Sequence, residues 1–272
     1  MKRYKILFNK LLLQNELAFV PFITLGDPNF KFSISIIENL IKSGADALEF
    51  GIPFSDPIAD GPIIQKSMLR SIKSGITLNK CFEIISIIRK KYKFIPIGLL
   101  MYANLIFNHG VNKFYKNCNN AGVDSVLIAD IPIEESEEFH NKAILNNIDP
   151  VYICPPNADK NLLKNIALKN KSYIYLLSRL GVTGKKNNNF IKLDNIINIL
   201  ANYNSVPILQ GFGISTSKQV KIAMKSKVSG VILGSAIIRI IELNINDKIK
   251  MLSKLNKFVT LIKSITKKTA IY

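Results

Sequence analysis

Eight short apolar runs recur along the chain, and they restrict the folds that it can adopt. Each run is nearly continuous in apolar residues, which is typical of parallel strands covered on both faces. Strands at a half-exposed face would instead alternate apolar and polar residues. The runs are Ala18–Thr24, Ala47–Gly51, Ile95–Tyr102, Ser125–Asp130, Pro150–Pro155, Tyr173–Ser178, Val206–Gly213 and Gly230–Ser235.

Amphipathic stretches separate these runs and predict helices. Examples are FKFSISIIENLIKSG, LNKCFEIISIIRKKY and VNKFYKNCNNAG, and Gly44 and Gly122 stand where a helix is expected to stop. No linker interrupts the alternation, and the 272 residues are close to the roughly 250 of a typical α/β barrel. The pattern predicts a single (β/α)₈ TIM barrel, with residues 1–272 forming one domain.

The two ends of the chain are basic and amphipathic. The N-terminal MKRYKILFNKLLLQNE predicts a short helix that closes one end of the barrel. The C-terminal KIKMLSKLNKFVTLIKSITKK predicts the outer helix after strand eight, although such a helix could also lie on a membrane surface. Because no apolar run reaches the roughly 20 residues that a membrane span needs, we expect no membrane partner.

The formal charge of +18 raises the possibility of a nucleic-acid partner. The lysines are spread along the chain and alternate with Asn and Ile. All three residue types have AT-rich codons, so base composition is the simpler explanation. We therefore expect no nucleic acid to bind. A basic nucleic-acid binder that uses the barrel as a scaffold remains the alternative from another class.

The cysteines and histidines give no metal-binding pattern. The chain has three cysteines, Cys81, Cys118 and Cys154, which lie far apart in the sequence. An odd number of distant cysteines favours a reduced, cytoplasmic protein. His109 and His140 have no partner at ligand spacing. The sequence therefore predicts no metal site.

The active site of an α/β barrel lies at the C-terminal ends of its strands. Here those positions are mostly apolar or aromatic and include one acid, which predicts a pocket for a flat hydrophobic group. The positions are Phe22, Glu49, Leu100, Tyr102, Ala129, Ile153, Tyr175, Gly211, Phe212, Gly213, Gly234 and Ser235.

Two glycine-rich segments, QGFGIS and LGSA, follow strands seven and eight and lead into helices. Backbone N–H groups at helix starts bind phosphate, and barrels commonly bind it at these two strands. The full GxGxxG fingerprint of a dinucleotide site is missing, because position 216 is Thr. The pattern favours a phosphate ester with an apolar body, although the glycines could serve only as turns.

The segment LEFGIPFSDPIADG places three acids around the end of strand two. Burial of Glu49 in an apolar pocket raises its pKa toward values useful for acid–base catalysis. Asp60 lies on the following loop and supplies a second carboxylate in another environment, while Asp56 beside Pro57 shapes the turn. Alternatively, Glu49 is a structural acid paired with a lysine or a backbone amide, and this segment alone does not decide between the two.

The loop after strand six, SRLGVTGKKNNN, is long and polar and predicts a mobile lid. This loop and the segments VPFITLGDP, LEFGIPFSDPIADG and QGFGIS closely resemble those of the tryptophan synthase α subunit family. The resemblance covers essentially the whole chain. The resemblance implies a (β/α)₈ barrel that cleaves indole-3-glycerol phosphate to indole and glyceraldehyde 3-phosphate. It also implies a β subunit that carries pyridoxal phosphate, no cofactor in this chain, and a heterotetramer of two subunits of each kind.

The resemblance assigns a role to each site residue. It makes Glu49 and Asp60 catalytic, with Tyr175 assisting, and it lets Thr183 on the lid reach Asp60 on closure. The other residues are substrate-binding, in an indole slot of Phe22, Leu100, Ala129 and Ile153 and a phosphate site of Gly184, Gly211, Phe212, Gly213, Gly234 and Ser235. Another phosphate-binding barrel of tryptophan or histidine biosynthesis is the nearest rival enzyme, but it has no reason to carry the Glu49–Asp60 pair.

Overall fold

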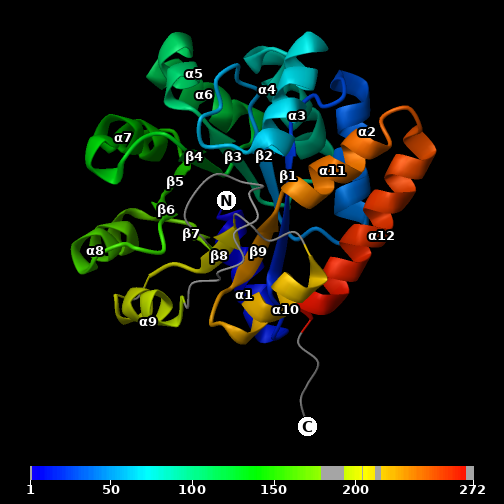
Figure 1. The fold of residues 1–272 in the computed structure, drawn as a ribbon. Helices are drawn as coiled ribbons and strands as arrows, with labels where there is room; N and C mark the ends of the chain where they lie inside the picture. Colours follow the sequence, from blue (N-terminus) through cyan, green and yellow to red (C-terminus); the bar gives the residue numbers. More distant parts are fainter. Residues whose placement is uncertain (1, 179–192, 204, 212–215, 268–272) are drawn as a thin grey trace.

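Parallel strands at the centre of the molecule are surrounded by helices (Figure 1). The computed structural model describes residues 2–178, 193–203, 205–211 and 216–267. The nine strand segments are hydrogen-bonded in the order β5-β4-β3-β2-β1-β9-β8-β7-β6. They are β1 (Ala18–Thr24), β2 (Leu48–Gly51), β3 (Ile97–Met101), β4 (Ser125–Ile128), β5 (Asp149–Val151), β6 (Ile153–Cys154), β7 (Ile174–Leu177), β8 (Ile208–Gly211) and β9 (Gly230–Leu233).

The segments β5 and β6 are the two halves of the single strand predicted at Pro150–Pro155. Tyr152 separates them because its N–H donates to the side-chain oxygen of Asn170 at 2.9 Å instead of to a neighbouring strand. Its carbonyl still accepts from the N–H of Tyr175 at 3.2 Å. Apart from this interruption the eight predicted runs form a closed barrel, so the predicted fold class is confirmed.

Helices follow the strands as the sequence predicts, and two of the glycine stops are confirmed. Gly122 ends its helix in the left-handed conformation, with φ of 86°, and Gly44 has φ of 110°. Short α5 and the 3₁₀ turn η1 were not predicted. The helices are α1 (Arg3–Leu13), α2 (Phe30–Lys42), α3 (Pro62–Lys73), α4 (Leu78–Lys91), α5 (Ala103–His109), α6 (Val111–Ala121), η1 (Ile133–Glu135), α7 (Glu137–Leu145), α8 (Lys160–Lys169), α9 (Asp194–Asn202), α10 (Ser217–Lys225), α11 (Ser235–Leu243) and α12 (Lys248–Thr266).

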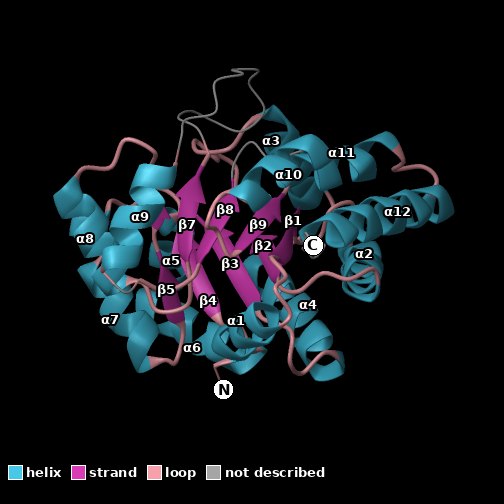
Figure 2. Cartoon of the chain, turned by 90° about the horizontal axis from the view of Figure 1, so that it is seen from below, coloured by secondary structure: helices cyan, strands magenta, loops and turns pink. Residues whose placement is uncertain are grey.

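Helix α1 closes one end of the barrel, as predicted. Figure 2 shows α1 and the N-terminus at the lower end of the strands. Tyr4, Phe8 and Leu11 are buried on one face of α1. The ring of Tyr4 lies 5.2 Å from the ring of Tyr173, centroid to centroid. The N-terminal end of the barrel is thereby sealed with aromatic side chains.

Helix α12 is an outer helix of the barrel, which confirms the first of its two interpretations. Its apolar face buries Met251, Leu255, Val259 and Ile262, and it packs against α2, α10 and α11. Within the described part of the chain, no helix is both long enough and apolar enough to cross a membrane.

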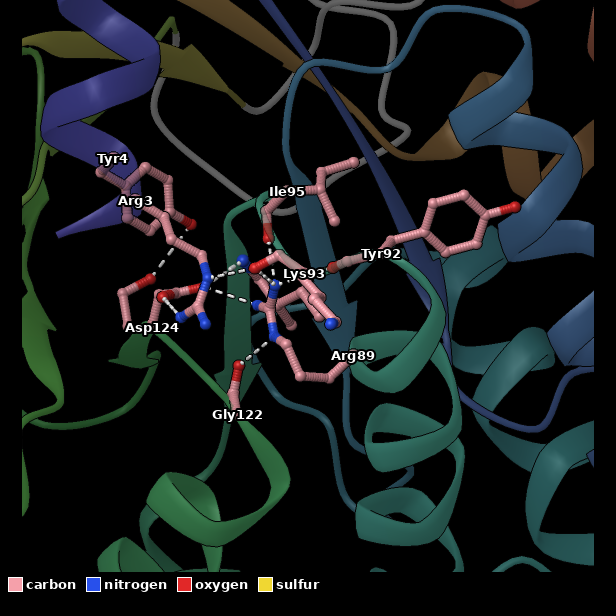
Figure 3. Close-up of polar contacts among 10 residues, drawn as sticks. Arg3, Tyr4, Arg89, Tyr92, Lys93, Ile95, Gly122 and Asp124 are labelled. Carbon is pink, nitrogen blue, oxygen red and sulfur yellow. Dashed lines mark hydrogen bonds and ion pairs between the residues drawn. The ribbon is translucent and has the colours of Figure 1, made fainter. Parts of the chain in front are cut away.

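A buried ion-pair network centred on Asp124 connects several elements at the N-terminal end of the barrel (Figure 3). The two carboxylate oxygens of Asp124 accept from Arg3 at 2.7 Å and from Arg89 at 2.8 Å, and one of them also accepts from the N–H of Ile97 at 2.8 Å. Arg89 also donates to the carbonyl of Gly122 at 2.9 Å. The network therefore ties α1 and α4 to the first residues of the barrel strands.

We expect Asp124→Asn to lower the free energy of unfolding by about 3 kcal/mol. The amide keeps one acceptor oxygen, so one of the two arginines loses its charged partner where water cannot replace it. Urea unfolding followed by circular dichroism measures the change. The control is Glu38→Gln, which breaks a pair with Lys91 that lies 2.7 Å away at the surface. Surface pairs contribute little, so the control should change stability far less. Equal effects of the two substitutions would contradict the role given to the network.

Candidate active site

Four of the predicted site residues lie on the barrel strands in two neighbouring pairs. Phe22 on β1 stands beside Glu49 on β2 in the strand register, and Tyr175 on β7 pairs with Ile153 on β6. The sequence places them there because every second residue of a strand points to the same side. The strand register thus places an aromatic residue beside the acid, as predicted.

Two glycines make room for these rings. A Cβ atom on Gly211 would lie 2.3 Å from the ring of Tyr175, and one on Gly51 would lie 2.6 Å from the ring of Phe22. Real Cβ atoms do not approach other atoms so closely. Gly211 therefore serves the site through the space that it leaves for Tyr175. Phe22 also lies against Gly234, where a Cβ atom would be 3.0 Å from its ring.

Glu49 is buried, with 1% of its surface exposed. One carboxyl oxygen accepts from the hydroxyl of Tyr173 at 3.3 Å, and the other, Oε2, has no hydrogen-bond partner among the described residues. The pKa of Glu49 is raised to about 8, mainly by burial; the hydrogen bond from Tyr173 lowers it, and the nearby charge of Asp60 raises it. Neither a lysine nor a backbone amide pairs with Glu49 in the described residues, so the alternative of a structurally paired acid is not supported.

Asp60 is the second buried acid, with 4% of its surface exposed. Its Oδ2 accepts from the hydroxyl of Tyr102 at 2.7 Å. Burial raises the pKa of Asp60 to about 6, although the hydrogen bond from Tyr102 lowers it. The two pKa values lie on opposite sides of neutrality. At pH 7 the site therefore holds a protonated Glu49 beside an ionised Asp60, a pairing suited to acid–base chemistry.

Asp56 is exposed, unlike the other two acids. It accepts a hydrogen bond from the hydroxyl of Ser55, and its carbonyl accepts from the N–H of Ile58 at 2.9 Å. These contacts lie within the turn around Pro57 and fit the loop-shaping role predicted for Asp56.

A cavity of about 570 Å³ opens beside the loop that carries Asp60. Its lining is mostly apolar and includes Ala129, Ile153 and Leu177, together with Ala59 from the loop that carries Asp60. The structure thus brings together two of the four residues predicted for the indole slot. Within the described residues, Phe22 and Leu100 are buried in the barrel core and are not part of this lining.

The predicted phosphate site is described only in part. Gly234 is the N-cap residue of α11 and Ser235 is its first residue, so LGSA does lead into a helix. Phe212, Gly213, Thr183 and Gly184 lie outside the described residues, as does most of the predicted lid.

Tyr102 and Tyr173 are the site residues whose contacts the sequence did not reveal. Tyr102 stands at a predicted strand end but received no role, and Tyr173 was not considered. The strand period could have indicated them, because residues two apart on a strand face the same side. Tyr173 precedes Tyr175 by two residues, and Tyr102 follows Leu100 by two. In the part of the chain that the structure describes, no three His, Cys, Asp or Glu residues are grouped as metal ligands would be.

Comparison with known proteins identifies the family. A family model described as "Tryptophan synthase alpha chain" matches residues 8–267. The tryptophan synthase alpha chain of Escherichia coli strain SMS-3-5 is 53% identical over 267 residues, covering 98% of this chain and 100% of the relative. That of Shigella sonnei is 54% identical over the same length, with the same coverage of both chains.

Solved structures agree with this result. A tryptophan synthase alpha chain from Legionella pneumophila has a TM-score of 0.89 at 26% identity and covers 100% of both chains. A chain from the tryptophan synthase a2b2 complex of Pyrococcus furiosus has a TM-score of 0.80 at 30% identity, covering 91% of this chain and 98% of its own.

The raised pKa of Glu49 predicts a pH-dependent stability. Its pKa moves from 4.5 to about 8 on folding, so between these values the folded state binds more protons than the unfolded chain. The free energy of unfolding should therefore fall as pH rises through this range, by up to about 1.4 kcal/mol per pH unit. Below this range Glu49 is protonated in both states, so its stabilising effect is fully present and no longer changes with pH. Asp60 adds a similar effect at lower pH, between 3.8 and about 6.

We expect Glu49→Gln to remove the larger part of this dependence. The variant should resemble the starting protein near pH 5 and be more stable than it near pH 8, since the amide has no charge to desolvate. Urea unfolding at several pH values gives the comparison, and Glu83→Gln on the exposed face of α4 is the control. If Glu49→Gln has no stabilising effect near pH 8, Glu49 is not desolvated as described.

Proposed function

Because the chain belongs to the tryptophan synthase alpha chain family, we propose that it cleaves indole-3-glycerol phosphate to indole and glyceraldehyde 3-phosphate. This is a carbon–carbon lyase reaction, a retro-aldol cleavage. The observation that carries the proposal is the pair of buried carboxyl groups, Glu49 and Asp60, with pKa values of about 8 and about 6. The loop that carries Asp60 also lines a mostly apolar cavity of about 570 Å³, which suits an indole ring.

The chemistry divides between the two acids. Protonated Glu49 gives its proton to C3 of the indole ring, and the resulting indolenine carries a positive charge that ionised Asp60 stabilises at the ring N–H. The bond between C3 and the glycerol chain then breaks, and its electrons restore the aromatic ring. The glycerol hydroxyl loses its proton to the Glu49 carboxylate as the aldehyde forms. Glu49 ends the cycle protonated, so no outside acid is consumed.

The remaining site residues position the substrate in this proposal. Phe22, Leu100, Ala129 and Ile153 hold the indole ring, and Tyr175 assists the reacting end. Gly184, Gly211, Phe212, Gly213, Gly234 and Ser235 bind the phosphate, by backbone N–H groups at helix starts. Thr183 on the lid bonds Asp60 when the loop closes. Protein groups supply each step, so we propose that this chain needs no cofactor.

Glu49→Gln should abolish nearly all turnover while leaving the fold intact, because an amide can neither donate nor accept the transferred proton. The loss of a general acid–base residue typically costs about 10²–10⁴-fold. Release of indole from indole-3-glycerol phosphate is the assay. The exposed Glu83→Gln serves again as the matched control and should keep full activity. A Glu49→Gln variant with half of the original activity would disprove the assignment.

We further propose that the chain works in a complex with a tryptophan synthase beta subunit, which carries pyridoxal phosphate. Indole is apolar and would escape unless it is passed on directly. The solved Pyrococcus furiosus relative is described as an a2b2 complex with mutual activation. The segments Pro53–Asp60 and Asn104–Asn108 carry exposed apolar side chains, with Ile58 exposed at 73% and Phe107 at 54%. Both stand next to the site, which makes them the expected contact surface.

Asp56→Ala should weaken this complex and lower the activation of indole release by the beta subunit, because an exposed charge suited to a basic partner residue is lost. Calorimetric titration of the beta subunit measures affinity, and indole release measures activation. Glu83→Ala, far from the two segments in the sequence and on α4, is the control. If neither quantity changes in Asp56→Ala, the contact surface is placed wrongly.

The remaining properties follow from membership of a biosynthetic family. We propose that residues 1–272 form one domain and that the protein acts in the cytoplasm on a small phosphorylated substrate. The spread-out lysines have no role in the proposed reaction, so neither nucleic acid nor a membrane enters it.

A further inference from the structure

The side chain of Tyr102 holds the loop that carries Asp60. Its hydroxyl donates to Oδ2 of Asp60 at 2.7 Å and accepts from the backbone N–H of Ala59 at 3.2 Å. Its ring stacks on the ring of Phe54, with centroids 5.2 Å apart and planes inclined by 29°. Three points of one loop thus rest on one tyrosine. Tyr102 itself is fully buried, at 0% exposure.

The backbone of Tyr102 belongs to a different surface segment. Tyr102 is the N-cap residue of α5, and its carbonyl accepts from the N–H of Leu105 at 3.2 Å. The N–H of the next residue, Ala103, donates to Oδ1 of Asp130 at 2.9 Å, which anchors the start of α5 to the loop after β4. A displacement of α5 therefore moves the tyrosine that supports Asp60.

Helix α5 also presents a surface to solvent. Asn104, Phe107 and Asn108 are exposed on it, and they belong to one of the two segments proposed to contact the beta subunit. We propose that Tyr102 is the positioning residue for Asp60 and that it links Asp60 to a beta subunit docked on α5. This inference rests on the proposed function, since it assigns the partner a route to the catalytic acid.

The hydroxyl of Tyr102 should affect both where the Asp60 carboxylate lies and how readily it ionises. It donates to the ionised carboxylate of Asp60, so it favours the charged form that the reaction needs. A buried tyrosine has only two side-chain torsions and little freedom to drift. Without the hydroxyl, Asp60 loses a charged hydrogen bond, which is among the stronger contacts in a protein.

The first test is the titration of Asp60 in Tyr102→Phe, which removes one oxygen and keeps the ring. Carbon-13 NMR of aspartate-labelled protein follows the carboxyl group, and Asp60→Asn identifies its signal. We expect the pKa of Asp60 to rise in Tyr102→Phe and to stay unchanged in Tyr115→Phe, a buried tyrosine on α6. An unchanged pKa in Tyr102→Phe would overturn the positioning role. This measurement needs neither substrate nor partner.

The second test is the affinity for the beta subunit. Tyr102 is buried and cannot touch a partner, so a direct contact is not lost in Tyr102→Phe. If docking on α5 acts on Asp60 through Tyr102, the reverse coupling must also exist, and removal of the hydroxyl should weaken binding about fivefold or more. Tyr115→Phe should bind as the unchanged protein does. Equal affinities of all three proteins would overturn the link, as would the absence of any complex.

Activity separates this inference from the proposed function. In Tyr102→Phe, kcat for indole release should fall about tenfold while KM changes little, because Asp60 acts on the charge that develops during the reaction. A fall in affinity alone, with kcat unchanged, would contradict the positioning role. If the unchanged protein binds the beta subunit and shows the Asp60 titration but releases no indole, the proposed reaction fails and the role of Tyr102 stands.

Discussion

Exclusion of water from the interior of the barrel determines the properties of Glu49. Glu49 stands between Phe22 of β1 and Gly98 of β3 in the strand register, and helix α1 seals the opposite end of the barrel. Just below Glu49, the hydroxyl of Tyr4 lies 3.2 Å from that of Ser125. This cluster needs the absence of a side chain at Gly98, where a Cβ atom would lie 2.8 Å from Ser125 Oγ and 3.0 Å from the Tyr4 hydroxyl. A carboxyl group held above such a closed interior keeps its proton at neutral pH.

Asp60 differs from Glu49 because it sits on a loop and accepts a strong hydrogen bond from Tyr102. This hydrogen bond, at 2.7 Å, is shorter than the 3.3 Å bond from Tyr173 to Glu49. It opposes desolvation, and the pKa of Asp60 stays below neutrality while that of Glu49 rises above it. Two carboxyl groups in one pocket thereby take different protonation states at the same pH. Most of the separation between the two pKa values comes from their surroundings, since the ordinary values of 4.5 and 3.8 lie much closer together.

The two ends of the barrel have different tasks. At the catalytic end, burying Glu49 without a countercharge costs stability at neutral pH. At the opposite end, Asp124 joins Arg3 and Arg89, and Lys263 on α12 bonds both Glu16 and Asp46 at 2.9 Å. These pairs tie terminal helices and strand starts together where no chemistry takes place. The division agrees with the general rule that the N-terminal face of such barrels serves stability.

The sequence by itself determined the barrel, the outer helices and the positions of the two acids. Apolar runs and helical periods are local patterns, and a single barrel is the compact arrangement that covers eight such strands on both faces. The segment around Glu49 and Asp60 also indicated that these two carboxyl groups lie at and just after a strand end. Strand boundaries shifted by one or two residues, and Tyr152 split one strand, because Asn170 competes for a backbone N–H that the apolar pattern does not describe.

Only the tertiary structure decided which groups control the two acids. Tyr173 reaches Glu49 across 124 residues of sequence, and Tyr102 reaches Asp60 across 42. Local sequence contains the strand period that puts each tyrosine on an inward face, but not the closure of the barrel that places it opposite a given carboxyl group. The degree of desolvation likewise depends on every element packed around the acid. Proton affinity in this site is therefore a property of the assembled barrel, because burial and hydrogen bonding arise only when distant segments meet.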